Sequence, residues 1–139
     1  MQNESQRWEW FDYLKVIPAI IIAFIIFYVS SLSNPYTFTP TNFTRIIINP
    51  LLHICEFGAL SFLLLFGLYP RLRAVYLVSL SFFYAFIDEL HQFFVPYRYF
   101  DIIDLLFDLT GILFGYLAYI FYGLIGEDLR KRFEKHEKV

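Results

Sequence analysis

The chain has 139 residues, 58% of them hydrophobic, with a mean hydropathy of +0.54 and a formal net charge of −2. This composition excludes an ordinary soluble domain and favours an integral membrane protein. No basic groove with interleaved aromatic residues is present, so we expect no nucleic acid among the partners.

Four apolar windows follow one another, at about residues 16–32, 51–69, 74–95 and 102–126. Each has about the 17 to 25 residues that an α-helix needs to cross roughly 30 Å of hydrocarbon. The sequence therefore predicts an all-α fold, an integral membrane bundle of four transmembrane helices that forms a single domain over residues 1–139, with a basic tail at 127–139. The sequence carries no indication of an oligomeric state.

The basic residues divide unevenly between the two sides of the predicted bundle. The loops on one side hold only Arg45 and Arg98, whereas nine basic residues flank the other side: Arg7, Lys15, Arg71, Arg73, Arg130, Lys131, Arg132, Lys135 and Lys138. By the positive-inside rule, both termini are expected in the cytoplasm (N-in/C-in) of a multi-pass protein of the cell membrane.

The first window has no ionisable residue after Lys15 and ends before Asn34-Pro35, so we interpret it as a lipid-facing wall. The second window begins with Asn49, a plausible N-cap, and Pro50 at the first helical position. Cys55 has no cysteine partner and is interpreted as a small core residue.

Polar residues interrupt the second and third windows near one end. His53 and Glu56 are three residues apart and share a helix face. The stretch "FFYAFIDELHQFFVPYR", residues 82–98, carries four polar side chains shortly before its proline. At 100° per residue they occupy an arc of about 160°, which we expect to line the bundle interior. These four are Asp88, Glu89, His91 and Gln92.

The fourth window carries one stripe of polar and small residues. Asp101 is interpreted as the helix N-cap, and Asp104 and Asp108 follow at spacings of three and four. Gly111 and Gly115 continue the same stripe as a G-x-x-x-G pair, which predicts close approach of a neighbouring helix.

The topology places the ionisable residues of three helices in one layer, about 3 to 11 Å below the outer boundary at a rise of about 1.5 Å per residue. Charges in a membrane are costly, so these groups must face one another, water or a partner. The possible positive groups are two histidines and Arg98, against five carboxylates: Glu56, Asp88, Glu89, Asp104 and Asp108. Shared protons, an ion pair with Arg98 and a bound cation all remain open.

A divalent metal site could assemble from four of these residues on two helices: His53, Glu56, Asp88 and His91. Mixed nitrogen and oxygen ligands suit zinc, manganese or iron, and the sequence does not choose among them. The zinc-protease spacing H-E-x-x-H is absent. The alternative is a purely structural role for the whole layer, as a buried ion-pair network that fixes helix register and carries out no reaction.

Four blocks resemble the VanZ-like family of membrane proteins: "YVSSLSNP", "HICEFGAL" from His53, "DELHQFFVPYR" from Asp88 and "DLLFDLTGILFG" from Asp104. The resemblance covers about residues 28–118. Tyr97 stands where the family often has a small residue such as glycine, and position 108, Asp or Asn in the family, is Asp. The family's polar signature falls on His53, Glu56, Asp88, Glu89, His91, Gln92, Arg98, Asp104 and Asp108.

The resemblance implies an envelope role, because the family's namesake is associated with low-level resistance to teicoplanin, a glycopeptide that binds cell-wall precursors outside the membrane. The first hypothesis is an outward-facing acidic and histidine-containing pocket that binds or modifies a lipid-linked or cell-wall head group and affects glycopeptide (teicoplanin) susceptibility. In the enzymatic form Asp88, Glu89 or His91 would act as acid or base. Binding of the head group would involve Gln92, Arg98, Asp104 and Asp108. The side chains of His53 and Glu56 would orient it or act as metal ligands.

Two other classes of function compete with this hypothesis. The first is a non-enzymatic protein that binds or translocates lipids or ions, although ionisable groups confined to the outer half argue against a path across the bilayer. The second is a structural membrane scaffold, for which Asp104→Asn with Asp108→Asn would change stability alone.

Overall fold

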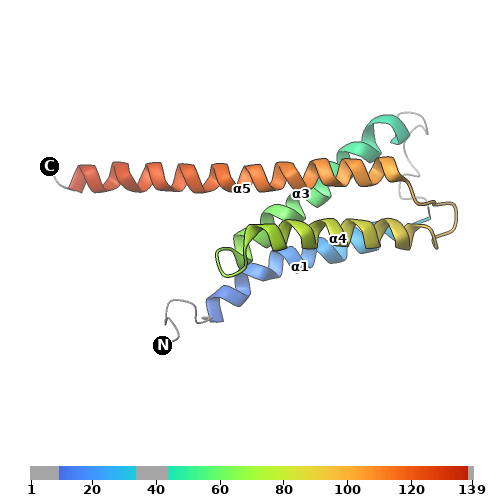
Figure 1. Ribbon diagram of the computed structural model, residues 1–139, viewed down its shortest axis with the longest axis horizontal. Helices are drawn as coiled ribbons and strands as arrows, with labels where there is room; N and C mark the ends of the chain where they lie inside the picture. The colour runs from blue at the N-terminus through green and yellow to red at the C-terminus, as the bar shows by residue number, and fades with distance from the viewer. Residues whose placement is uncertain (1–9, 34–43, 138–139) are drawn as a thin grey trace.

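The computed structural model describes residues 10–33 and 44–137, and every regular element in these two ranges is a helix. The structure contains four long helices, α1 (Trp10–Ser30), α3 (Asn49–Leu68), α4 (Ala74–Gln92) and α5 (Ile102–Glu137) (Figure 1). A π-helical segment, η2 (Thr44–Ile48), runs directly into α3. Each long helix contains a stretch long and apolar enough to span a membrane. The predicted all-α, four-helix membrane fold is confirmed.

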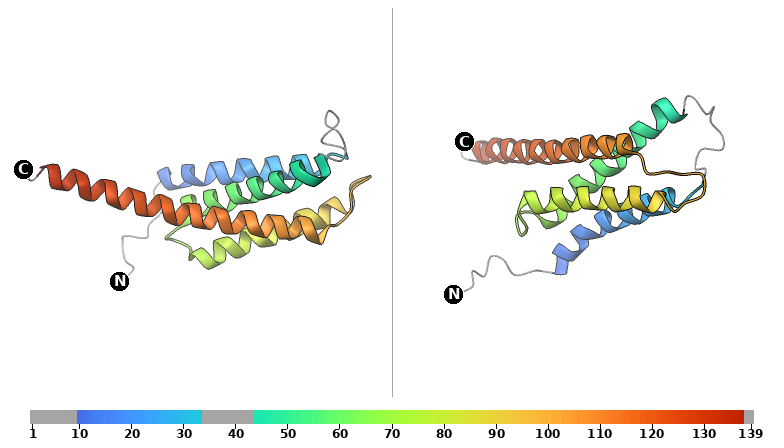
Figure 2. Two further views of the ribbon diagram at one scale, coloured as in Figure 1. Left: turned by 90° about the horizontal axis from the view of Figure 1, so that it is seen from above. Right: turned by 45° about the vertical axis from the view of Figure 1, so that its right-hand side comes forward.

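The helix bounds differ from the apolar windows at three places. α1 begins at Trp10, before Lys15, and α5 continues through the basic tail to Glu137, running past the other helices (Figure 2). α4 ends earlier than expected, at Gln92. Its last turn tightens, with bonds from Phe94 N to His91 O (2.9 Å) and from Val95 N to Gln92 O (3.0 Å). Such three-residue bonds satisfy the carbonyl groups at a helix end.

The prediction that Asn49 is the N-cap of α3 is wrong. The N-cap of α3 is Ile48, which has helical backbone angles because η2 runs directly into α3. Asn49 is therefore already helical, and its buried Oδ1 atom has no hydrogen-bond partner among the described residues. Pro50 does stand in the first turn, where its missing N–H costs nothing.

α3 is the central helix of the bundle. Its most extensive contacts are with α5 and then with α1, while α4 packs on α5 and α3 and touches α1 only sparsely. The core lies where these helices meet and consists of Ile26, Phe57, Leu60, Ala85 and Ile112.

Many large apolar side chains point away from this core. Phe24 of α1 is 70% exposed, and Phe83 of α4 is 60% exposed. In water such a surface would aggregate, whereas the hydrocarbon of a membrane solvates it. Cys55 also faces outward, so the expectation that it is a core residue is wrong. It shares α3 with the inward-facing His53 and Phe57, and two residues along a helix turn a side chain by about 200°.

Glycines allow α3 and α5 to cross at backbone contact. A Cβ atom at Gly111 would collide with the carbonyl oxygen of Ile54, and one at Gly115 with that of Gly58. Facing them, a Cβ at Gly58 would lie 3.1 Å from the carbonyl oxygen of Gly111. The G-x-x-x-G prediction of close helix approach is confirmed, and this crossing brings the nearby polar residues of the two helices together.

A tight turn after α4 returns the chain toward the bundle. Arg98 N donates to Val95 O at 3.1 Å, Pro96 occupies the second position, and Tyr97 at the third has a φ of 65°. Proline followed by a positive φ is typical of a type II turn. The turn places Arg98 so that its side chain reaches Gln92 in the last turn of α4.

The left-handed backbone at Tyr97 leads to a prediction about stability. The side chain is 95% exposed, so its replacement removes little packing. We expect Tyr97→Gly to be more stable than Tyr97→Ala by about 1 kcal/mol, because alanine keeps the Cβ that a positive φ disfavours. Thermal unfolding of the two purified variants in the same detergent measures the difference. Equal stability, or a more stable alanine variant, would show that the turn relaxes to another conformation.

Candidate functional site

Buried polar side chains gather at one end of the bundle, where α1 and α4 end and α3 and α5 begin (Figure 1). We call this group the polar cluster; each member is at most 8% exposed, and all four helices contribute: Ser30, His53, Asp88, Glu89, Gln92 and Asp108. The cluster caps the apolar core of the bundle. A polar group this deeply buried is stable only when its hydrogen bonds are satisfied within the protein or by a ligand or water.

His53 of α3 lies between two aspartates of α5. Its Nδ1 atom is 2.7 Å from Oδ1 of Asp108, and its Nε2 atom is 3.8 Å from Oδ2 of Asp104. The two aspartates are four residues apart and therefore share a helix face. The glycine crossing explains the short distance, because His53 directly precedes Ile54 and Asp108 stands about one turn before Gly111, the two residues in backbone contact.

Gln92 connects the carboxylates of α4 to Arg98. Its Nε2 atom donates to Oδ2 of Asp88 at 3.0 Å and to Oε1 of Glu89 at 3.1 Å, which uses both amide protons. Its Oε1 atom accepts two bonds from Arg98, one from Nε at 3.1 Å and one from a terminal nitrogen. The positive charge thus acts on the carboxylates through an amide and is not paired with them directly.

Two further bonds tie the cluster to α1 and to the start of α5. Ser30 Oγ donates to Oδ2 of Asp88 at 2.6 Å. The backbone N–H of Asp101 donates to Oε2 of Glu89 at 3.1 Å. Asp101 also caps α5, since its Oδ1 atom accepts from the N–H of Ile103 at 2.9 Å, as the sequence predicted. Glu89 therefore sits at the positive end of the α5 dipole.

Two carboxylate oxygens in the cluster have no partner among the described residues: Oδ1 of Asp88 and Oδ2 of Asp108. Both atoms are buried, and Asp108 is 0% exposed. A buried acceptor without a donor costs about 1 to 3 kcal/mol, and more when it is charged. The cluster therefore has unused capacity for a cation or a hydrogen-bond donor.

The residues that could hold a metal differ from the set predicted from the sequence. One ligand atom each from His53, Glu89 and Asp108 lies within 4.8 Å of the other two. Of the four residues predicted as metal ligands, this triad contains only His53. Glu56 is half-buried one turn further along α3, and Asp88 faces Ser30 and Gln92.

His91, the fourth predicted ligand, is directed toward α1. Its ring stacks on Phe27, with centroids 4.7 Å apart and an interplanar angle of 21°. Its buried Nδ1 atom has no hydrogen-bond partner among the described residues. His91 therefore forms one side of the cluster's contact with α1, and it faces a different side of α4 from the triad residue Glu89 two positions before it.

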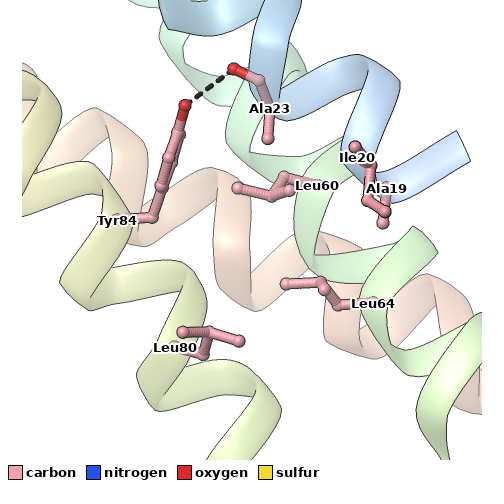
Figure 3. Close-up of a pocket in the computed structure, with 7 residues that line it drawn as sticks. All are labelled: Ala19, Ile20, Ala23, Leu60, Leu64, Leu80 and Tyr84. Carbon is pink, nitrogen blue, oxygen red and sulfur yellow. Dashed lines mark hydrogen bonds between the residues drawn. The ribbon is translucent and has the colours of Figure 1, made fainter. Parts of the chain in front are cut away.

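An apolar groove of about 180 Å³ lies between α1, α3 and α4, one to two turns from the cluster along α4. Figure 3 shows its lining: Ala19, Ile20, Ala23, Leu60, Leu64, Leu80 and Tyr84. The one hydroxyl in this lining, that of Tyr84, donates to the carbonyl oxygen of Ala23 at 2.7 Å. The groove thus offers a ligand apolar surface only.

The groove and the cluster share the same helix faces. Leu80, Tyr84 and Asp88 are spaced by four residues on α4, so the groove wall continues into the cluster. On α1, Ala23 and Ser30 are two turns apart on one stripe and connect the two regions in the same way. The polar cluster and the apolar groove therefore follow one another along the bundle axis.

A protein-family model described as VanZ/LLP1 matches residues 4–124. The chain belongs to the VanZ/LLP1 family. No curated protein and no solved structure matches it. Together with the four membrane-spanning helices, the match makes this chain a multi-pass membrane protein of the VanZ family.

The blocks that resemble the VanZ family meet at the polar cluster, although they lie far apart in the sequence. Asp104 contacts His53, and Arg98 reaches the cluster through Gln92. Glu56 is close enough to interact electrostatically with His53 and Asp88. All nine predicted site residues thus lie at the same end of this VanZ-family bundle.

Sequence reasoning missed Ser30, which bonds to Asp88 of the cluster, and Tyr84, which lines the groove. Ser30 was overlooked because α1 was interpreted only as a lipid-facing wall, and Tyr84 because a tyrosine in an apolar helix is unremarkable by itself. The spacing of Ala19, Ala23 and Ser30 was the available signal, since small residues on one stripe mark the packed face of a membrane helix.

Proposed function

We propose that this VanZ-family protein binds the head group of a lipid-linked molecule of the cell envelope in the polar cluster, with part of the lipid tail in the adjoining groove. The supporting observation is the set of buried, incompletely satisfied carboxylates in membrane-spanning helices. Ionisable residues at such depth are costly and by default mark a functional site.

The chemistry of the cluster favours a head group that carries both donors and an anionic group. Unpartnered oxygens of Asp88 and Asp108 would accept hydrogen bonds from hydroxyl, amide or amine groups. Arg98 uses some of its five N–H donors on Gln92 and keeps others for a phosphate or carboxylate. A lipid-linked cell-wall precursor has this combination of groups, with its polar part outside the hydrocarbon.

The groove supports a lipid as the carrier of that head group. Its lining is apolar and belongs to the membrane-spanning segments, so the group that fits it is an acyl or prenyl chain. A lipid tail in the groove would lie one turn along α4 from Asp88, the residue that accepts a hydrogen bond from Ser30. Outward orientation of the cluster, with both termini in the cytoplasm, belongs to the proposal and rests on the distribution of basic residues.

Translocation of lipids or ions is the second candidate, and the core argues against it. Below the cluster the buried positions are apolar, and they include Phe57, Leu60 and Ile112. A polar path would have to cross this layer. Liposomes containing the purified protein, assayed for lipid flip and ion flux, are expected to behave like empty liposomes. Transport above that background would favour translocation.

The binding proposal is tested on membranes and on cells. The full-length protein in nanodiscs is mixed with a polyprenyl-diphosphate-linked cell-wall precursor, and native mass spectrometry counts bound lipid. We expect Asp88→Asn, Glu89→Gln and Arg98→Gln each to weaken binding by at least about tenfold, because each removes a charged hydrogen bond worth about 1.5 to 3 kcal/mol. Glu127→Gln, an exposed carboxylate on the projecting part of α5, is the matched control and should bind normally.

Glycopeptide susceptibility provides the cellular readout. In a strain whose teicoplanin susceptibility changes when this protein is expressed, the three cluster variants are expected to lose the effect while their membrane abundance stays normal. Full retention of the effect by every variant would contradict a role for the cluster. Unchanged precursor binding by Asp104→Asn with Asp108→Asn, accompanied by reduced stability alone, would favour the scaffold interpretation.

A further inference from the structure

Three helices each contribute one potential metal ligand to the centre of the polar cluster. His53 comes from α3, Glu89 from α4 and Asp108 from α5, and one ligand atom of each lies within 4.8 Å of the other two. Glu89 and Asp108 are each 0% exposed, and His53 is 8% exposed. A metal site in the core of a helix bundle is built in the same manner, from inward-pointing side chains of facing helices.

We propose that His53, Glu89 and Asp108 bind one divalent transition-metal ion, with zinc as the reference metal. One imidazole nitrogen and two carboxylate oxygens form a ligand set that zinc accepts, with a fourth position left for water or a ligand. Bond lengths of about 2.0 to 2.2 Å place tetrahedral ligand atoms about 3.3 to 3.6 Å apart. The present separations are at most 4.8 Å, and small side-chain rotations would adjust them to these values.

The unpartnered oxygen of Asp108 is independent support for a cation. Its Oδ2 atom is buried without a hydrogen-bond partner among the described residues, although Oδ1 of the same group is bonded to His53. Neighbouring Asp88 also has one buried unpartnered oxygen. Protein donors satisfy nearly all buried acceptors, so two orphaned carboxylate oxygens in one cluster indicate a site for a positive ligand.

The surroundings of the triad would hold its members in place. Glu89 accepts from Gln92 on one oxygen and from the Asp101 backbone on the other, which fixes its carboxylate plane while leaving lone pairs for a metal. Asp104 lies 3.8 Å from the second nitrogen of His53. A carboxylate beside a ligating histidine is a usual outer-shell partner that orients the ring.

Charge balance gives a further reason for a divalent cation. Two carboxylates carry a charge of −2 when ionised, so one divalent ion would neutralise the triad inside a membrane-spanning region where net charge is expensive. Arg98 does not fulfil this task, because its guanidinium bonds to the Gln92 oxygen. The metal site would stand even if the lipid proposal failed, since its ligands are all protein groups.

Metal binding is measured on the full-length protein in nanodiscs after removal of any affinity tag and stripping with chelator. Zn²⁺ alone is titrated by calorimetry, and the bound metal is counted by elemental mass spectrometry. We expect one Zn²⁺ per chain, and an affinity at least about 100-fold weaker for Glu89→Gln and for Asp108→Asn, because loss of even an outer-shell partner costs about 10- to 100-fold. Glu127→Gln, an exposed carboxylate on the projecting part of α5, should keep the wild-type affinity.

Absence of stoichiometric Zn²⁺, or equal affinity in all three variants, would overturn the proposal. If Asp108→Asn does not fold, judged by helical circular dichroism, Glu89→Gln and cobalt substitution of the wild-type protein decide the question. Co²⁺ is expected to give a saturable visible absorption that one equivalent of Zn²⁺ abolishes, and no such band would count against the site. Precursor binding by the metal-stripped protein is measured separately, so that failure of one proposal is distinguishable from failure of the other.

Discussion

Replacing Gly115 by alanine is expected to separate α3 from α5 and to destabilise the protein by about 3 kcal/mol or more. The new Cβ would collide with the carbonyl oxygen of Gly58, and a backbone atom in a packed helix has no rotamer with which to move aside. Overpacking against side chains already costs about 1 to 3 kcal/mol. Gly111→Ala should behave similarly, because its Cβ would meet the carbonyl oxygen of Ile54.

Gly123→Ala is the matched control on the same helix. No atom lies within 4 Å of the Cβ position there, so alanine should be neutral or stabilise α5 by up to about 1 kcal/mol through its better helix propensity. Unfolding of the three variants in detergent micelles with increasing dodecyl sulfate gives the free-energy differences. A Gly115→Ala variant as stable as Gly123→Ala would show that the two helices are not in backbone contact.

Removal of the Asp108 carboxylate is expected to produce the second large effect. Asp108→Leu would leave the buried His53 ring without its 2.7 Å partner, and breaking a buried charged pair costs about 3 to 5 kcal/mol. Adding His53→Leu should recover part of this loss, because the buried imidazole that lost its partner would then be removed from between α3 and α5. The double variant is expected to be more stable than the sum of the single variants by about 1 to 3 kcal/mol.

The same unfolding assay measures the cycle, with Glu127→Gln as an exposed carboxylate control that should leave stability unchanged. Strict additivity of the two single effects would contradict the His53–Asp108 contact. A stable double variant that no longer binds a lipid-linked precursor would separate folding from function. That result would indicate that these polar residues lower stability and serve ligand binding.

The helices themselves could be predicted from the sequence because their cause is local. Each apolar window is as long as a bilayer is thick, and a backbone in hydrocarbon must satisfy its hydrogen bonds internally, which leaves a helix as the solution. The acidic stripe of α5 and its glycine pair could also be read from spacing alone, since residues three and four apart share a helix face. The VanZ-like blocks were visible for the same reason, as short motifs within single segments.

Pairings within the polar cluster depended on the tertiary structure. Which carboxylate meets His53 is decided by the rotation and crossing of α3 against α5, and sequence spacing does not determine the rotation of one helix relative to another. The predicted metal set therefore included His91, which turns toward Phe27 instead, and omitted Glu89 and Asp108. Ser30 illustrates the same limit, because its hydroxyl donates to Asp88 only when α1 is packed beside α4.

The amino-acid sequence by itself determined that this chain forms four membrane-spanning helices with its polar residues near one end, because bilayer thickness and helix periodicity act on each segment separately. The tertiary structure alone decided that His53, Glu89 and Asp108 converge, that Gln92 stands between Arg98 and the carboxylates, and that an apolar groove adjoins them. Those features arise from contacts between helices. They depend on a backbone crossing of α3 and α5 that only glycine at positions 111 and 115 permits.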